Sequence, residues 1–198
     1  LSLGAWRELV DLLGELAGRT ENTDLAGRFR RFAARLALQR LEDPERAVGF
    51  LLTEVRLAND PINAAQEAVD LLVEEGAAAY GLDLLKMAVE LDLQDDVRAA
   101  FLEQMLPVVA ALEPDAAARG RKLGHLAALY PVNDTIFGAL QELCTENALW
   151  DVLGDAYEAR IPHLGDGEKP DDYLAWGQIQ AEALDDPDAA EATFRKGL

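Results

Sequence analysis

Five arginines stand close together near the start of the chain, and three of them share one helical face. Arg28, Arg31 and Arg35 recur at intervals of three and four residues, the spacing that places side chains on one side of an α-helix. Guanidinium groups bind carboxylates through paired hydrogen bonds, so this row could hold an acidic peptide or a C-terminal carboxylate. Alternatively, the arginines pair with acidic neighbours such as Glu45 or Glu67 and join adjacent helices. We take all three as candidate partner-binding residues and expect Arg28 and Arg31 to be exposed.

A group of acidic residues near the C-terminus offers oxygen atoms to a hard cation. It comprises Asp166, Glu168, Asp171 and Asp172, with Gly167 among them. The order departs from the calcium-binding EF-hand loop, which needs acidic or amide residues at alternating positions and a glycine at the sixth. An acidic loop in which Asp171 or Asp172 caps the next helix explains the same residues. We therefore predict no metal site.

Groups that could act in catalysis are few and far apart. His125 and His163 are 38 residues apart, and neither has a partner at a metal-ligand spacing such as H-x3-H. The single cysteine, Cys144, could in principle pair with His163 as a nucleophile. It lies between Leu140 and Leu143 on one side and Ala148 on the other, however, where a thiol behaves as a small core residue. We predict no catalytic residue and no cofactor, and hence that the chain is not an enzyme.

The chain is strongly acidic, with 18 Lys and Arg against 37 Asp and Glu and a net charge of -19. Residues 1–41 hold seven basic and five acidic side chains, and residues 42–198 hold eleven and thirty-two. Such a field repels a phosphate backbone and attracts basic peptides or basic protein faces. We therefore expect no nucleic-acid partner. The alternative interpretation is that dispersed acidic residues only keep a helical surface soluble.

Composition leaves the compartment open. No segment reaches the ~20 consecutive apolar residues of a membrane helix, and no signal-peptide pattern stands at the start, so we predict no membrane insertion in this segment. One cysteine excludes an internal disulfide and fits either redox environment, which leaves the cytoplasm as the default location. The first residues read as the middle of a repeat, so we expect a fragment of a longer protein.

Apolar periodicity and helix stop signals predict eleven helices and no strand. Proline at a first helical turn and its effect on the preceding residue set several of the starts. Pro107 falls inside the sixth helix, which is therefore expected either to kink or to divide there. The expected helices cover about 3–17, 24–41, 44–58, 61–75, from after 76 to 91, from after 96 to 112, from 114, from 131, 147–161, 171–184 and from 187.

The predicted helices recur at a regular interval. Apolar stretches open 38, 36, 34, 36 and 37 residues apart, at Trp6, Pro44, Tyr80, Pro114, Trp150 and Pro187. A longer period appears when residues 61–82 are set against 131–152 without a gap, which places Pro61 on Pro131 and Tyr80 on Trp150. A period in the mid-thirties is typical of solenoids of helix pairs, because one pair cannot bury its apolar face without a stacked neighbour.

Two short signatures recur within these helices. Residues 150–157, WDVLGDAY, fit the pattern W-x2-L-G-x2-Y, and Ala47 with Leu51 and Ala190 with Phe194 fit the pattern A-x3-F in its apolar form. These patterns resemble the first-helix and second-helix signatures of tetratricopeptide repeats, units of about 34 residues. By phase, residues 150–157 fall in a second helix, so we take their match as a decoy. The resemblance then implies that the even-numbered helices are first helices lining a concave groove that receives peptides.

The expected fold is all-α: a right-handed α-solenoid of antiparallel helix pairs, with residues 1–198 forming one continuous array of divergent repeats. The function that the resemblance implies is a non-enzymatic scaffold that binds a peptide or protein surface in the concave groove. The alternative is a structural assembly module that self-associates, or stacks onto flanking repeats, through its apolar terminal helices.

Overall fold

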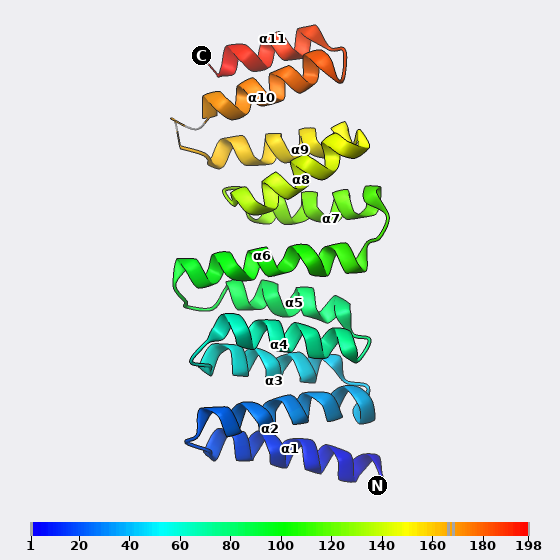
Figure 1. Cartoon of the computed structure of the whole chain (residues 1–198), viewed down its shortest axis with the longest axis vertical. Coiled ribbons are helices and arrows are strands. Elements are labelled where there is room, and N and C mark those ends of the chain that lie inside the picture. The colour runs from blue at the N-terminus through cyan, green and yellow to red at the C-terminus, as the bar shows by residue number, and fades with distance from the viewer. Residues whose placement is uncertain (1, 166, 168, 198) are drawn as a thin grey trace. The chain divides into compact units, whose positions relative to one another are not determined.

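The structure is a computed structural model that describes residues 2–165, 167 and 169–197. Over these residues the chain is all-α, with eleven α-helices and no strand, as predicted (Figure 1). None of the described helices is both long enough and apolar enough to cross a bilayer. The helices are α1 (Leu3–Arg19), α2 (Thr23–Leu36), α3 (Pro44–Leu57), α4 (Pro61–Glu74), α5 (Ala78–Val89), α6 (Asp95–Leu112), α7 (Ala116–Leu129), α8 (Asp134–Asn147), α9 (Trp150–Arg160), α10 (Lys169–Glu182) and α11 (Pro187–Lys196). A π-helical turn, η1 (Ala37–Leu41), extends α2, and a 3-10 turn, η2 (Ile161–His163), follows α9.

Three helices, α3, α4 and α11, start at a proline that an aspartate directly precedes. Asp43, Asp60 and Asp186 each cap a helix through the side chain, and the proline after each occupies the first turn. The expected start at Pro114 is wrong, and the eighth helix, expected to open within residues 131–134, begins at the end of that stretch. Asp115 caps α7, and Asn133 caps α8, because these are the first residues after each proline whose short side chains can accept an amide hydrogen bond.

This difference shifts the longer repeat. α4 begins at Pro61, whereas α8 begins at Asp134, three residues later than the ungapped alignment of 61–82 with 131–152 requires. The match of Pro61 with Pro131 therefore does not align two helix starts. In the sixth helix the chain does not divide, since α6 is one helix with Pro107 inside it.

The chain divides into two compact units, Leu1–Val108 and Val109–Leu198, and the division falls within α6. The prediction of one continuous array across both units stays a prediction.

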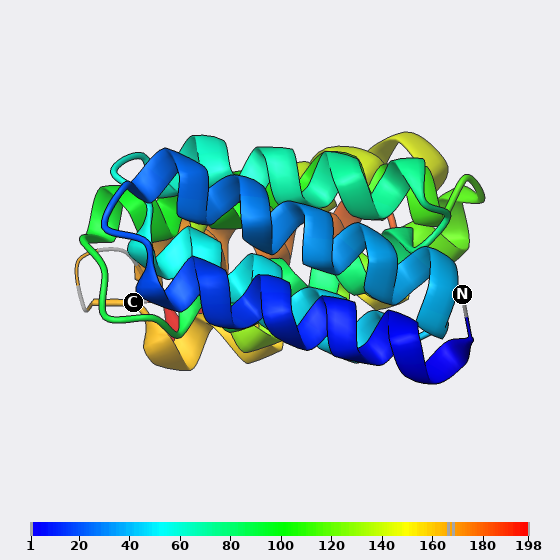
Figure 2. The same ribbon diagram turned by 90° about the horizontal axis from the view of Figure 1, so that it is seen from below.

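In the first unit, neighbouring helices pack in chain order from α1 to α5, and α3 also packs on α5. α1 and α2 lie side by side when seen from the N-terminal end (Figure 2). Val10 and Leu13 of α1 form a buried cluster with Ala33 and Leu36 of α2, and Phe50 of α3 packs against it. This arrangement buries the apolar stripe of each helix on its neighbours.

Close approach of α1 to α3 depends on a glycine. A Cβ at Gly14 would lie 2.8 Å from a ring carbon of Phe50, so only the absent side chain leaves room for the ring. Asp11 and Arg46 form an ion pair between the same two helices. Both the apolar and the polar contacts therefore join helices that are two apart in the chain.

In the second unit α7 packs on α8 and α9, α9 on α10, and α10 on α11. The ring of Tyr157 meets Phe137 edge-on at 4.9 Å and stacks on Trp176 at 5.6 Å between centroids. Arg160 is buried beside them and donates to Asp134 at 2.5 Å, to Asp172 at 2.8 Å and to the Pro131 carbonyl at 2.9 Å. These contacts hold α8, α9 and α10 together at one end.

Candidate functional site

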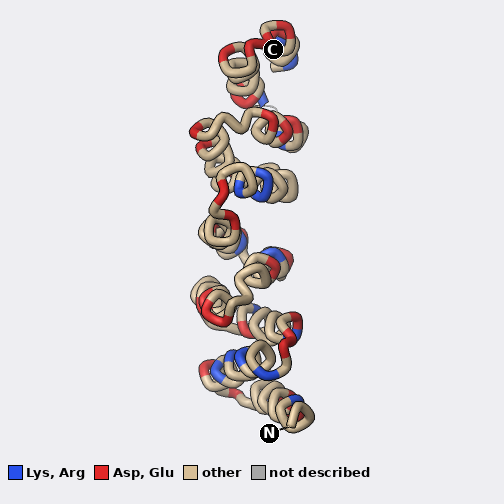
Figure 3. Tube along the Cα trace, turned by 90° about the vertical axis from the view of Figure 1, so that its right-hand side faces the viewer, with Lys and Arg blue, Asp and Glu red and all other residues tan. Residues whose placement is uncertain are grey.

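The structure places the three candidate arginines on α2 and gives them different surroundings. Lys and Arg are concentrated on α2 and again on α7, whereas Asp and Glu recur along the rest of the chain (Figure 3). Arg31 is half-buried and its Nη1 pairs with Glu54 of α3 and, at 2.8 Å, with Glu67 of α4. Arg28 is exposed and makes no ion pair within the described residues. Of the two acidic partners named from the sequence, Glu67 is found and Glu45 is not.

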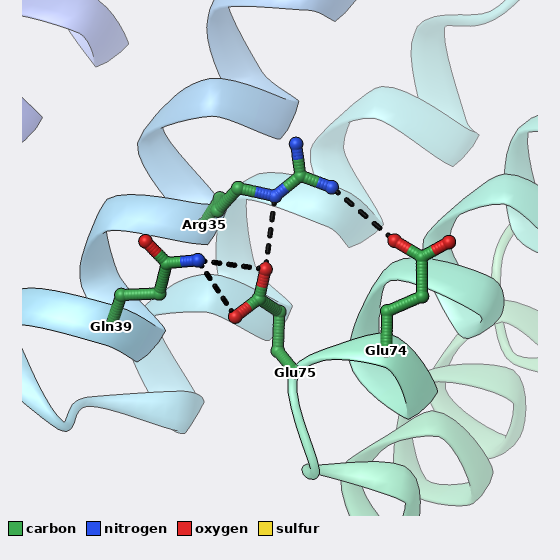
Figure 4. Close-up of polar contacts among 4 residues, drawn as sticks. All are labelled: Arg35, Gln39, Glu74 and Glu75. Atoms are coloured by element: carbon green, nitrogen blue, oxygen red, sulfur yellow. Dashed lines mark hydrogen bonds and ion pairs between the residues drawn. The ribbon is translucent and has the colours of Figure 1, made fainter.

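Arg35 takes part in a network that ties α2 to the end of α4. Its Nε lies 3.0 Å from Glu75, its Nη2 lies 3.4 Å from Glu74, and Gln39 donates to both oxygens of Glu75 at 2.9 Å (Figure 4). The Arg35 side chain is 44% exposed, so solvent screens these pairs and each contributes about 0.2–1 kcal/mol. Two of the three arginines are thus engaged in joining helices.

A polar hollow of about 290 Å³ opens between α2 and the first turns of α4, next to the end of α3. We refer to it as the α2–α4 cleft. Side chains of all three helices converge on it, and the residues that matter here are Gly27, Arg28, Arg31, Glu54, Leu57 and Glu67. The cleft belongs entirely to the first unit, so its geometry is defined by helices that pack directly on one another.

Glu54 is the unusual residue of the cleft. It is only 6% exposed, and its Oε1 pairs with Arg31. Its Oε2 is buried and has no hydrogen-bond partner among the described residues. A Cβ at Gly27 would lie 2.8 Å from Oε1, so the glycine makes the space that this carboxylate occupies. A buried carboxylate with one oxygen unmatched is costly and rare in folded proteins.

The charge state of Glu54 follows from this burial. Desolvation raises the pKa of Glu54 to about 7, against the opposing effect of the Arg31 guanidinium and with a further rise from Glu67. Arg30 also acts on Glu54, but its Nη2 is directed to the Ala17 carbonyl at the end of α1, at 3.5 Å. Near neutral pH this carboxyl is therefore divided between its charged and neutral forms.

The sequence contained a signal for Glu54 that our reading missed. Glu54 lies seven residues after Ala47 and three after Leu51, which is the apolar face of α3. A glutamate on a face that is otherwise buried must find a partner or neutralise. Arg30, also buried, lies four residues after Ala26 and three before Ala33, on the buried face of α2. The spacing of Arg28, Arg31 and Arg35 points to neither residue.

The acidic group near the C-terminus is only partly described. Asp166 and Glu168 lie outside the described residues. α10 begins at Lys169, so Asp171 and Asp172 lie inside its first turn and neither is the capping residue expected from the sequence. Asp172 accepts from Arg160 and so links α10 to α9. Within the described residues, no group of three or more potential metal ligands is found.

The potential catalytic residues lie apart from the cleft. Cys144 is buried on α8, and burial raises the pKa of its thiol to about 11, which keeps it protonated and inert at neutral pH. His125 lies on α7 and His163 in η2. Among the described residues the structure records no hydrogen bond between Cys144 and His163, so the nucleophile pair that the sequence left open has no geometric support.

Comparisons with protein-family models, with curated proteins and with solved structures find no match to this chain. The likeness to tetratricopeptide repeats therefore depends on the sequence signatures and stays a prediction.

Proposed function

We propose that this chain is a non-enzymatic protein-interaction module, a right-handed array of antiparallel helix pairs that binds a peptide or a protein surface. The observation that carries the proposal is the α2–α4 cleft, where three helices present charged side chains around a buried, incompletely matched carboxylate. The tetratricopeptide resemblance assigns α2 and α4 to the peptide-binding groove, and the cleft opens on these two helices.

The size and lining of the cleft favour a polypeptide partner. Pockets for small molecules usually enclose ~300–1,000 Å³ and are mostly apolar. The α2–α4 cleft, at about 290 Å³, lies at the lower end of that range and is lined largely by charged and amide side chains. Its dimensions suit one long side chain projecting from a larger surface, with additional contacts along the outer faces of the helices.

Exposed Arg28 is the residue best placed to test this function. Arg28→Glu reverses a charge at the cleft without removing any ion pair of the described residues, whereas changing Arg31 or Arg35 would also loosen the helix contacts. Arg7→Glu makes the same charge change on the exposed side of α1, outside the cleft, and serves as the matched control. Proteins captured from a lysate of the source cells by the three forms would be identified by mass spectrometry.

A partner that the parent chain and Arg7→Glu capture equally, and that Arg28→Glu captures more strongly or more weakly, supports a specific cleft interaction. If all three forms retain the same proteins equally, the cleft is not the binding surface and the proposal fails at this site. Circular dichroism of the variants must first give the same helical signal as the parent, so that loss of binding is not loss of fold.

A second function, self-assembly, is favoured by the outer face of α1. Leu12 is 51% exposed and Leu16 is 38% exposed, four residues apart on one helical face. Two half-exposed leucines at that spacing could pack on another copy or on a flanking repeat. Sedimentation of the parent and of a Leu12→Glu, Leu16→Glu variant over a range of concentrations separates the two functions, because only the assembly module would change its mass with concentration and with this variant.

A further inference from the structure

We propose that the α2–α4 cleft receives a lysine or arginine side chain of a partner polypeptide, and that the carboxylate of Glu54 binds its charged head. The inference deepens the function proposed above and rests on it. The row of arginines suggested an acidic partner, whereas the geometry around Glu54 favours a basic one.

One oxygen of the Glu54 carboxyl group has no hydrogen-bond donor among the described residues. Glu54 is more than nine-tenths buried and lines the cleft, yet Oε2 lacks a donor in the described part of the chain. In its charged form the carboxylate accepts hydrogen bonds and donates none, so a group that completes the charged site must donate one. A Cβ at Gly27 would lie 2.8 Å from Oε1, so the absence of a side chain there leaves room for the carboxylate.

The charged groups around Glu54 are also unbalanced. One guanidinium nitrogen, Nη1 of Arg31, serves two carboxylates, Glu54 and Glu67. The other buried cation nearby, Arg30, directs a nitrogen to the carbonyl of Ala17. Counting every charged residue that lines the cleft, four carboxyl groups face three guanidinium groups, and an ammonium or guanidinium head would balance the fourth; these residues are Asp24, Glu54, Asp60 and Glu67, and Arg28, Arg30 and Arg31.

The cleft also has an apolar edge. Leu57 and Ala58, at the end of α3, line it beside the charged groups, and Leu57 is 47% exposed. Lysine and arginine carry a long aliphatic stem that packs on apolar surface while the head reaches a polar group. A neutral amide donor would gain less from a carboxylate and nothing from the apolar edge. The chain's net charge of -19 would in addition steer a basic segment toward it.

Binding of a cation would be coupled to loss of a proton. Groups acting on Glu54 are Arg30 and Arg31 of α2 and Glu67 of α4, and Asp24, Arg28 and Asp60 also line the cleft. Glu54, with a pKa raised to about 7, binds a cation only in its charged form. Affinity should therefore rise as pH increases through that value, and the bound cation should lower the pKa of Glu54.

The test uses short acetylated peptides as probes of the full chain. A Gly-Ser-Lys-Ser-Gly peptide is compared with an arginine twin and with a norleucine twin, which keeps an apolar stem but has no charged head. The carboxyl carbon resonance of Glu54 is followed by NMR during titration and is assigned from the Glu54→Gln variant. Glu45→Gln removes an exposed glutamate on the same helix and is the matched control.

We expect the lysine and arginine peptides to shift the Glu54 resonance and to lower its pKa, with tighter binding one unit above the pKa than one unit below it. Loss of the charged acceptor in Glu54→Gln should weaken binding about tenfold or more, and Glu45→Gln should leave it unchanged. Should Glu54→Gln fail to fold, the lysine and norleucine peptides on the parent chain decide the question by themselves.

Equal binding of the lysine and norleucine peptides, or unchanged binding of the lysine peptide by a folded Glu54→Gln, would overturn the inference. Neither result would refute the proposed function, because a partner whose capture changes with Arg28→Glu and not with Arg7→Glu would still mark the cleft as a binding surface. Conversely, a lysine-selective shift without any captured partner would support the site and count against the module's proposed role.

Discussion

The pH dependence of stability offers the sharpest test of how Glu54 sits in this fold. In the folded chain the pKa of Glu54 is raised from 4.5 to about 7, chiefly because burial removes the carboxylate from water. The unfolded chain therefore releases this proton at a lower pH than the folded chain does. Between those two values the folded state holds one more proton, so the free energy of unfolding falls as pH rises.

The size of the effect follows from the shift itself. Each pKa unit corresponds to about 1.4 kcal/mol, so a rise from 4.5 to about 7 costs the folded state about 3 kcal/mol once Glu54 is fully charged. No cost applies below pH 4.5, where the residue is neutral in both states. Such a penalty is a large fraction of the 5–15 kcal/mol that is typical of folded domains.

Other carboxylates also titrate, so the measurement must isolate Glu54. Glu54→Gln keeps the shape of the side chain but does not ionise, and the difference in unfolding free energy between parent and variant contains the contribution of this residue. Urea unfolding at a series of pH values, read from hydrogen exchange of amides in α2 and α3, reports on the first unit. We expect the variant to gain about 3 kcal/mol relative to the parent between pH 4.5 and pH values above 7.

The same difference measured for Glu45→Gln provides the control, because Glu45 is exposed on α3 and its replacement should change stability by no more than about 0.5 kcal/mol. A parent-minus-variant difference for Glu54 that stays flat across this pH range would refute the reasoning. It would mean that water or a rearranged Arg31 solvates the carboxylate in the folded chain.

Three further changes test the contacts described above by urea unfolding. Gly27→Ala should destabilise the first unit by about 1–3 kcal/mol, since the new Cβ would lie 2.8 Å from Glu54 Oε1, whereas Gly49→Ala, with no neighbour within 4 Å, should stabilise α3 by about 0.5–1 kcal/mol. Arg160→Leu removes a buried guanidinium from Asp134 and Asp172 and should lower the free energy of unfolding of the second unit by about 3–5 kcal/mol. The exposed pair of Arg195 with Glu191 gives the comparison, and Arg195→Leu should lower it by about 0.5 kcal/mol or less. Arg35→Gln should cost about 1 kcal/mol or less, because its side chain is 44% exposed, and a loss of several kcal/mol would show that the network of Arg35 is stronger than its exposure implies.

The helices were predictable because their signals are local. Proline, aspartate and glycine act within a turn of where they stand, and apolar spacing survives divergence of the repeats. The start expected at Pro114 failed, and the eighth helix begins at the end of the stretch 131–134, for an equally local reason: the residue that caps the helix follows the proline instead of preceding it. Requiring an aspartate directly before the proline would have excluded Pro114 and Pro131 as helix starts, because Glu113 and Tyr130 precede them.

The site was harder to predict because it depends on pairing between helices. Spacing alone places Arg28, Arg31 and Arg35 on one face, but it does not say which of them meets a carboxylate from another helix. Arg31 meets Glu54 and Glu67, and Arg35 meets Glu74 and Glu75, which lie 23 to 40 positions later in the chain. Only the packing of α2 against α3 and α4 brings these groups together.

These ion pairs change the interpretation of the chain's uneven charge. The positive excess of residues 1–41 is met within the first unit by acidic residues of α3 and α4, so much of it serves the fold and is not offered to a partner. At the cleft the balance is the opposite, because four carboxyl groups and three guanidinium groups line it. The row of arginines suggested an acidic ligand, whereas the contacts of these arginines leave a carboxylate that a cation would complete. The sign of the partner's charge is therefore the property most worth measuring.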